Sequence, residues 1–289
     1  MTISRRQFLG SSSALLGTAA LAPFAARLNA WTLKAPLAVQ AYDLKDLLAK
    51  DYEGTWKAIG GLGYKLIDMV SFPGYDFDPK LANITAKDIR KSLKTAGLGC
   101  EICHFPAAHF QNAYAKTIAF ARDLGAKSVI AMPDLAKAKT LEDWKGVAKQ
   151  MNEIGKKTQA DGLPLGYHNH EFEFRAVSGG VPYDTLMAET DPKLVSFQLD
   201  VGNLKVGGGD PVTYINKYKD RYFAAHLKDS AQGKLGLALG EGTLDWKAIL
   251  AAFHATKVNN YTVETGAPAE QILAKYKASI AFIRKVNVA

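Results

Sequence analysis

Short apolar runs alternate with amphipathic stretches along the chain from about residue 36 onward, and Gly or Pro commonly separates them. An apolar run bounded by such turn residues is typical of a buried strand, whereas apolar positions repeating every three or four residues indicate a helix. The pattern predicts strands over 37–42, 65–71, 99–105, 128–132, 165–172, 195–201, 222–228 and 261–265. It predicts helices between them, among others over 86–96, 112–124, 141–161, 214–220, 246–256 and 269–286.

Strands that alternate with helices pair in parallel, because each helix carries the chain back to start the next strand in the same direction. Eight such units in about 250 residues fit one closed (β/α)8 barrel, a TIM barrel. No Pro- or Ser-rich linker divides the chain, so we expect a single α/β domain over residues 31–289. An open, doubly wound sheet is the alternative that this pattern allows.

The first 30 residues have the features of an export signal rather than of the fold. Arg5 and Arg6 stand in the run Ser-Arg-Arg-Gln-Phe-Leu, which is a twin-arginine pattern, and a charge-free stretch over 10–26 follows. That stretch is too short and too rich in Ser, Gly and Ala to span a membrane. We therefore expect cleavage near Ala30, a periplasmic protein and no stable membrane insertion afterwards. A retained N-terminal anchor is the alternative.

Composition and charge narrow the classes of partner. The chain is 48% hydrophobic and 22% charged, as ordinary globular proteins are, and its formal net charge is +8. The basic residues are spread along the predicted helices instead of forming one stripe, so nucleic acid is not an expected partner.

Candidate chemistry collects at the carboxyl ends of the predicted strands, where barrels of this kind carry their catalytic groups. The last four predicted strands each end with a His, Asp or Glu in an otherwise apolar setting, where an unpaired charge is costly to bury. A mixed nitrogen and oxygen set of this kind suits one divalent metal ion: Mn²⁺, Co²⁺, Fe²⁺, Zn²⁺ or Mg²⁺. Acidic residues are also common as helix caps at such turns, which is the structural alternative. The candidates are His168, His170, Glu173, Asp200, His226 and Glu264.

The third predicted strand raises two further points. His104 lies at its end and is a candidate for contact with a substrate, as are the aromatic rings of Phe72 and Phe105. Cys100 and Cys103 stand in a Cys-x-x-Cys-His run, which is also the pattern of c-type haem attachment. Side chains alternate along a strand, so the two cysteines are expected on opposite faces, which argues against haem.

The chain resembles the xylose-isomerase-like TIM-barrel superfamily, in its sugar phosphate isomerase/epimerase (AP endonuclease family 2) branch, from about Ala38 to the C-terminus. The matching motifs occur in the family's order. They are Tyr-His-Asn-His-Glu-Phe-Glu-Phe over 167–174, Gln-Leu-Asp-Val-Gly-Asn over 198–203, His-Leu-Lys-Asp over 226–229, Leu-Gly-Glu-Gly over 239–242 and Val-Glu over 263–264.

The resemblance implies one metal ligand at each of the last four strands. Asp200, His226 and Glu264 match three of these positions. His168 stands where the family's epimerases have a glutamate, so either His168 or Glu173 is expected as the fifth-strand ligand. The implied activity is that of an exported, metal-dependent sugar isomerase or epimerase that removes a proton next to a carbonyl.

Roles in that activity follow from the same motifs. Glu264, His170 or Glu173 is the expected base, and Lys228 is expected to stabilise or protonate the resulting oxyanion. A salt bridge from Lys228 to Glu241 or Asp229 is the structural alternative. Asn203 and Glu241, in the matching motifs, are expected to contact a small carbohydrate.

The same candidate residues are compatible with other functions. Elimination or hydration on a 3-keto-glycoside would pass through the same enediolate. A sugar-binding protein with a degenerate site is the alternative outside enzymes, because His168 replaces the usual glutamate. The superfamily's endonuclease branch uses more ligands on the first four strands, where His104 is the candidate, and is disfavoured. A homo-oligomer stays open.

Overall fold

A computed structural model describes residue 33 and residues 35–72, 76–177 and 179–286. The twin-arginine pattern and the expected cleavage position lie outside the described residues, so both stay predictions. Within the described part of the chain, none of the helices is long and apolar enough to cross a membrane.

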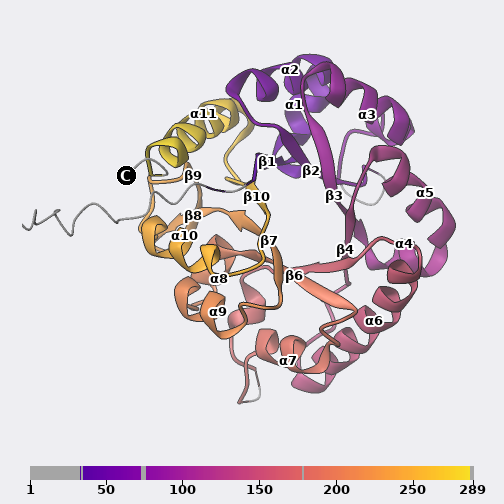
Figure 1. Ribbon diagram of the computed structural model, residues 1–289, viewed down its shortest axis with the longest axis vertical. Coiled ribbons are helices and arrows are strands. Elements are labelled where there is room, and N and C mark those ends of the chain that lie inside the picture. Colours follow the sequence, from indigo (N-terminus) through magenta and orange to yellow (C-terminus); the bar gives the residue numbers. More distant parts are fainter. Residues whose placement is uncertain (1–32, 34, 73–75, 178, 287–289) are drawn as a thin grey trace, which may run out of the picture. The chain divides into compact units, whose positions relative to one another are not determined.

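Eight parallel strands close into a barrel in the order β1-β10-β7-β6-β5-β4-β3-β2 (Figure 1). Each strand pairs with its neighbour along the chain, and β1 pairs with β10 to complete the circle. The predicted (β/α)8 barrel is therefore confirmed. The barrel strands are β1 (Leu37–Gln40), β2 (Leu66–Val70), β3 (Gly99–Pro106), β4 (Ser128–Met132), β5 (Leu165–His168), β6 (Val195–Asp200), β7 (Tyr222–Leu227) and β10 (Asn260–Val263).

Helices surround the strands as an outer ring (Figure 1). Their starts follow local capping chemistry: the Thr140 side chain accepts from the Asp143 amide, and the Asp143 carboxylate accepts from the Thr140 amide, which together begin the longest helix. The helices are α1 (Lys45–Lys50), α2 (Tyr52–Leu62), α3 (Ala86–Thr95), α4 (Ala107–Asn112), α5 (Tyr114–Leu124), α6 (Leu141–Ala160), α7 (Pro182–Glu189), α8 (Val201–Val206), α9 (Pro211–Lys217), α10 (Trp246–His254) and α11 (Ala269–Val286).

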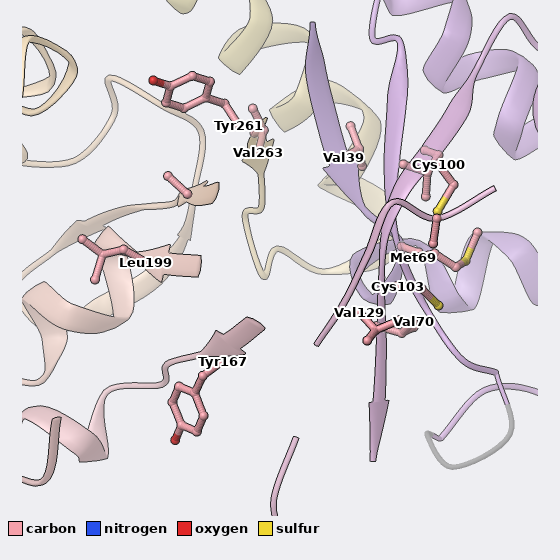
Figure 2. Close-up of a cluster of buried hydrophobic side chains, with 14 of the residues drawn as sticks. Val39, Met69, Val70, Cys100, Cys103, Val129, Tyr167, Leu199, Tyr261 and Val263 are labelled. Carbon is pink, nitrogen blue, oxygen red and sulfur yellow. The ribbon is translucent and has the colours of Figure 1, made fainter. Parts of the chain in front are cut away.

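The strands have two different faces, because successive side chains point to opposite sides. Apolar residues on the outer face form the main core against the helices, and Figure 2 shows members of this cluster such as Val39, Met69, Val129 and Leu199. The inner face carries polar groups instead, among them Asp68, Gln198 and Thr262, all of them buried. Ile102, Ile130 and Ala224 form a separate small apolar cluster on this inner face, so the buried polar groups are kept apart from the main core.

Strand β5 is shorter than the sequence pattern predicts. It ends at His168, and a 3-10 turn (Phe172–Phe174) follows instead of four more strand residues. The turn is stabilised by Glu173, whose carboxylate accepts hydrogen bonds from the His170 amide at 3.0 Å and from the Tyr167 hydroxyl at 2.9 Å. His170 and Glu173 consequently lie on a loop above the strand.

A short antiparallel hairpin, β8 (Asp229–Ala231) with β9 (Lys234–Leu237), follows β7 and was not anticipated from the sequence. The expected opposition of the two cysteines is also corrected. The register between β2 and β3 shifts by one residue, so that Ile67 pairs with Cys100 and Asp68 with Ile102. As a result, Cys100 and Cys103 are both buried free thiols in the same hydrophobic cluster (Figure 2).

Candidate metal centre

Four side chains from the last four barrel strands converge at the carboxyl mouth of the barrel. His168 ends β5, Asp200 ends β6, His226 lies near the end of β7, and Glu264 follows β10 directly. One donor atom of each lies within 4.8 Å of the others. His168, Asp200 and His226 are buried, and the Glu264 side chain is 13% exposed.

Strand register brings these residues together. Asp200 is the Cα partner of His226 across β6 and β7, and His168 is the partner of Gln198, two residues before Asp200. Residues two apart share a face, so all of these side chains point into the barrel. Motifs that are separate in the sequence therefore place their side chains next to one another at the barrel mouth. We call His168, Asp200, His226 and Glu264 the donor arc.

Lys228 contributes a cation to this arc. Its Nζ lies 2.6 Å from Glu264 Oε1 and 3.2 Å from Asp200 Oδ2, and its side chain is 6% exposed. Neither alternative partner forms an ion pair with Lys228 in the described structure: Glu241 pairs with Lys275, and Asp229 accepts from the amides of Gly240 and Gly242. Lys228 thus joins the two carboxylates of the candidate site.

The charges of the site are set by these contacts. Burial raises the pKa of Glu264, but the Lys228 ammonium and the His226 hydrogen bond outweigh it and hold the pKa well below the usual value. Burial also opposes the charge of Lys228, yet the carboxylates of Asp200 and Glu264 raise its pKa. At neutral pH, Glu264 is a carboxylate and Lys228 an ammonium ion.

The two histidines differ in their protonation. Burial, followed by the repulsion of His226 and other imidazoles, lowers the pKa of His168 well below its usual value. Burial acts in the same direction on His226, but hydrogen bonds to Asp68 and Glu264 raise its pKa to about 9. His168 is therefore a neutral imidazole, the form that binds metals.

A buried carboxylate, Asp68 on β2, lies beneath the arc. Its Oδ2 lies 2.9 Å from His226 Nε2, and its Oδ1 lies 2.9 Å from His104 Nε2. Burial raises the pKa of Asp68, but the neighbouring His104 and His226 hold it well below its usual value. Asp68, His104 and His226 form a second group with metal-binding chemistry.

A cavity of about 260 Å³ opens above the donors. His170 lines it with a side chain that is 38% exposed, so this histidine faces the space where a ligand would lie. The His170 ring stacks on Phe172, with centroids 5.4 Å apart, and its Nδ1 lies 3.9 Å from Glu173 Oε1. The other lining residues are Gln40, Tyr42, Val70, His104, Met132, His168 and Glu264.

The structure separates Glu173 from the donor arc. Its carboxylate is fully buried and is used by the Tyr167 hydroxyl and the His170 amide. The fifth-strand member of the grouped donors is His168, and Glu173 supports the loop that carries His170.

The remaining candidate substrate contacts lie in different places. His104 lines the cavity as expected, whereas Asn203 is buried and donates its amide N–H and side-chain N–H to Asp200. Phe72 packs on Phe77, and Phe105 faces the outer helices, where it contacts Phe110 and Phe120. Neither ring is among the residues that line the cavity: strand alternation turns Phe105 towards the helices, and Phe72 packs on Phe77.

Glu241 also lies apart from the cavity lining. It pairs with Lys275 of α11 and accepts from the Ala238 amide. Sequence reasoning missed Asp68 and Gln198, although Asp68 gives the same signal as Asp200: one acid in an otherwise apolar strand.

The donor set fits a divalent cation. Two imidazoles and two carboxylates give a mixed nitrogen and oxygen environment within the range of one ion. The Lys228 ammonium between Asp200 and Glu264 shows that a positive charge is accommodated there. His168, Asp200, His226 and Glu264 are therefore the residues that would hold a metal.

Comparison with known proteins places the chain among relatives. Residues 56–286 match the family profile described as Xylose isomerase-like TIM barrel. The chain belongs to this family. An inosose dehydratase of Clostridium tetani (strain Massachusetts / E88) is 32% identical over 140 residues, which are 42% of this chain and 45% of that protein. The chain thus spans less than half of that relative's length.

Solved structures share the fold. A sugar phosphate isomerase/epimerase from Parabacteroides distasonis ATCC 8503 superposes with a TM-score of 0.77 at 23% identity, over 88% of this chain and 96% of that one. The IOLI protein, solved with a bound zinc atom, gives a TM-score of 0.66 at 15% identity, over 86% and 97%. At these identities the similarity establishes the fold.

Proposed function

We propose that the protein is a divalent-metal-dependent enzyme that removes the proton next to the carbonyl of a small carbohydrate. The observation that carries the proposal is the group of His168, Asp200, His226 and Glu264 with Lys228 beside it. When bound, a divalent cation polarises a carbonyl oxygen and orients the sugar. The zinc in the IOLI protein and the donor chemistry support a metal here, with Mn²⁺, Co²⁺, Fe²⁺, Zn²⁺ and Mg²⁺ as candidates.

Glu264 is the proposed base. Its pKa is held low, so it is ionised at neutral pH, and its 13% exposed side chain lines the cavity. It takes the proton from the carbon next to the carbonyl. Lys228, whose raised pKa keeps it charged, stabilises the negative charge that develops on the enediolate oxygen.

His170 is the proposed acid. It lines the cavity on a different element from Glu264, and although burial lowers its pKa, the nearby Glu173 carboxylate raises it overall. His170 gives its proton to the β-oxygen as that carbon–oxygen bond breaks, so that a carbon–carbon double bond forms and water leaves. The name of the Clostridium tetani relative, an inosose dehydratase, supports this elimination.

Isomerisation or epimerisation is the second candidate from the same intermediate. It results when a proton returns to carbon instead of to the departing oxygen. His170 and Glu264 line the same cavity from different elements, which supports return of the proton from a second group. Inososes, free ketoses and 3-keto-glycosides all present the required carbonyl and acidic C–H.

The test measures the metal bound to the protein and the exchange of a substrate proton for deuterium. The purified protein would be analysed for bound metal, stripped with a chelator, reloaded, and incubated with inososes, free ketoses and 3-keto-glycosides in D₂O. We expect about one metal per chain, deuterium or an elimination product with the reloaded wild type, and at least a ~100-fold loss in Glu264→Gln. Exposed Glu270 provides the matched control, Glu270→Gln, with unchanged activity.

The product then distinguishes the two reactions, because elimination releases water and isomerisation does not. If the protein bound sugars but held no metal and catalysed no deuterium exchange, the enzyme proposal would be contradicted and a sugar-binding protein would be the remaining interpretation.

We also propose export to the periplasm by the twin-arginine route, supported by Arg5 and Arg6 in their sequence context. Fractionation of cells that express the wild type and an Arg5→Lys/Arg6→Lys variant tests this. We expect the variant to stay in the cytoplasm, and equal export of both would contradict the proposal.

A further inference from the structure

Asp68 is the hub of a hydrogen-bond network beneath the donor arc. It is 1% exposed and lies on β2, whereas the four grouped donors come from β5, β6, β7 and the end of β10. Its Oδ2 accepts from His226 Nε2 at 2.9 Å, from Gln198 Nε2 at 2.6 Å and from Thr262 Oγ1 at 3.0 Å. Its Oδ1 lies 2.9 Å from His104 Nε2. No lysine or arginine pairs with it in the described structure, so its charge is met by imidazole, amide and hydroxyl groups.

This network determines which nitrogen of His226 is available to a metal. An ionised carboxylate only accepts hydrogen bonds, so the contact with Asp68 requires a proton on His226 Nε2. His226 Nδ1 lies 2.6 Å from the Glu264 carboxylate, so it too is protonated in the metal-free protein. A metal held by the grouped donors would take the place of this Nδ1 proton, while the contact with Asp68 keeps the proton on Nε2.

The same reasoning extends to His168 through Gln198. Because Asp68 only accepts, the Gln198 group that faces it must be the NH₂, which directs the amide oxygen to His168. Gln198 Oε1 lies 3.0 Å from His168 Nδ1 and accepts a hydrogen bond from its N–H. The lone pair of neutral His168 is therefore on Nε2, the nitrogen that is free to bind a metal.

We propose that Asp68, directly and through Gln198, fixes the tautomers of both His226 and His168, and thereby commits the site to a transition metal over Mg²⁺. This inference rests on the metal-dependent function proposed above. Imidazole is a good ligand for Zn²⁺, Co²⁺ and Fe²⁺, whereas Mg²⁺ prefers six oxygen ligands. With two imidazoles locked in their ligand form, half of the protein donors are nitrogen.

The energetic reason is preorganisation. A histidine that donates its second N–H to a carboxylate or amide oxygen is held in orientation and is a more basic ligand. Loss of such a partner typically lowers metal affinity by about 10–100-fold. Here one carboxylate serves two ligands, so its replacement affects both.

The experiment uses the full-length protein, stripped and titrated with Co²⁺, Zn²⁺ and Mg²⁺, in wild type, Asp68→Ala, Gln198→Met and Thr262→Val. Gln198 and His226 both donate to Asp68 Oδ2, and Asp68→Ala removes this acceptor, so we expect a ~10–100-fold loss of Zn²⁺ and Co²⁺ affinity and an altered Co²⁺ absorption spectrum. Gln198→Met is expected to give a smaller loss. Thr262→Val removes a hydrogen bond from the same carboxylate but leaves its contacts with His226 and Gln198 in place, and is the matched control, with affinity within about threefold of wild type.

A direct readout is the ¹⁵N–¹H spectrum of the imidazoles in the zinc-loaded wild type. We expect protonated Nε2 on His226 and protonated Nδ1 on His168. The opposite tautomers, equal Zn²⁺ affinity in all four proteins, or Mg²⁺ binding as tight as Co²⁺ would overturn the inference. Gln198→Met keeps the test decisive if Asp68→Ala does not fold. A wild type that binds no metal would instead refute the proposed function itself.

Discussion

Replacement of Lys228 by Met is expected to change metal affinity and turnover in opposite directions. The ammonium lies 2.6 Å from Glu264 and 3.2 Å from Asp200, both of them grouped donors, and its side chain is 6% exposed. It therefore competes with a metal for the same carboxylates, yet it is the group that stabilises an enediolate. Lys228→Met should lower turnover while it raises metal affinity.

The magnitudes follow from charge and distance. Two unit charges about 4–5 Å apart repel by about 3–4 kcal/mol at an effective dielectric constant of about 20. Part of this gain is lost to protons, because burial and the Glu264 charge raise the pKa of Asp200 and Lys228 no longer lowers it, so a proton competes with the metal for this carboxylate. We therefore expect metal affinity to rise by roughly tenfold. Loss of a preorganised oxyanion donor typically costs about 10²–10³ in kcat.

The assay combines a Co²⁺ or Zn²⁺ titration with turnover of the metal-saturated protein. Lys217→Met is the control, because Lys217 pairs with Asp184 on the surface with a side chain that is 47% exposed. It should change neither quantity. If Lys228→Met lost metal affinity and turnover in the same proportion, Lys228 would be a structural partner of the carboxylates and the proposed role would be wrong.

Three further predictions concern the same site. Glu173→Gln weakens the support of the His170 loop, so kcat should fall by ~10-fold with metal affinity unchanged, which a parallel titration checks. The pKa of His226 in the metal-free protein is raised to about 9, so its stabilising contribution is fully present below pH 6.5 and is lost as pH rises through about 9. Metal binding displaces that proton, and affinity should therefore rise up to ~10-fold per pH unit until about pH 9, as measured by titration across pH. A Cβ at position 202 would lie 2.5 Å from the Lys228 carbonyl oxygen, so Gly202→Ala should lower thermal stability by ~1–3 kcal/mol and disturb the site, which thermal unfolding and metal titration would detect.

The alternation of apolar and polar positions was sufficient to predict the barrel. Strand 128–132 has the predicted bounds, and the predicted helix over 141–161 ends one residue later than α6. These elements are specified locally, because an apolar strand between turn residues and a capped amphipathic helix carry their own signals. The positions of Asp200, His226 and Glu264 followed from the same local signals, since the carboxyl ends of barrel strands meet at one mouth.

Other features depended on contacts between distant segments. The end of β5 at His168 is set by the Glu173 carboxylate, which binds back to Tyr167 and to the loop backbone. The two cysteines share one cluster because a register shift between β2 and β3 moves Cys100, and no property of either strand alone specifies that shift. Phe105 likewise looks suitable for a sugar pocket in sequence, but its face of the strand points to the helices.

The sequence by itself therefore determined the elements, their order and the mouth at which the chemistry collects. Only the tertiary structure decided which groups act together. Asp68 and His226 are 158 positions apart, and Asp68 and Gln198 are 130 apart, yet closure of the barrel brings β2 across from β6 and β7 within hydrogen-bonding distance. Periodicity reports which face a side chain is on, whereas a hydrogen-bond network across a barrel interior depends on the strand register and on the closure of the sheet.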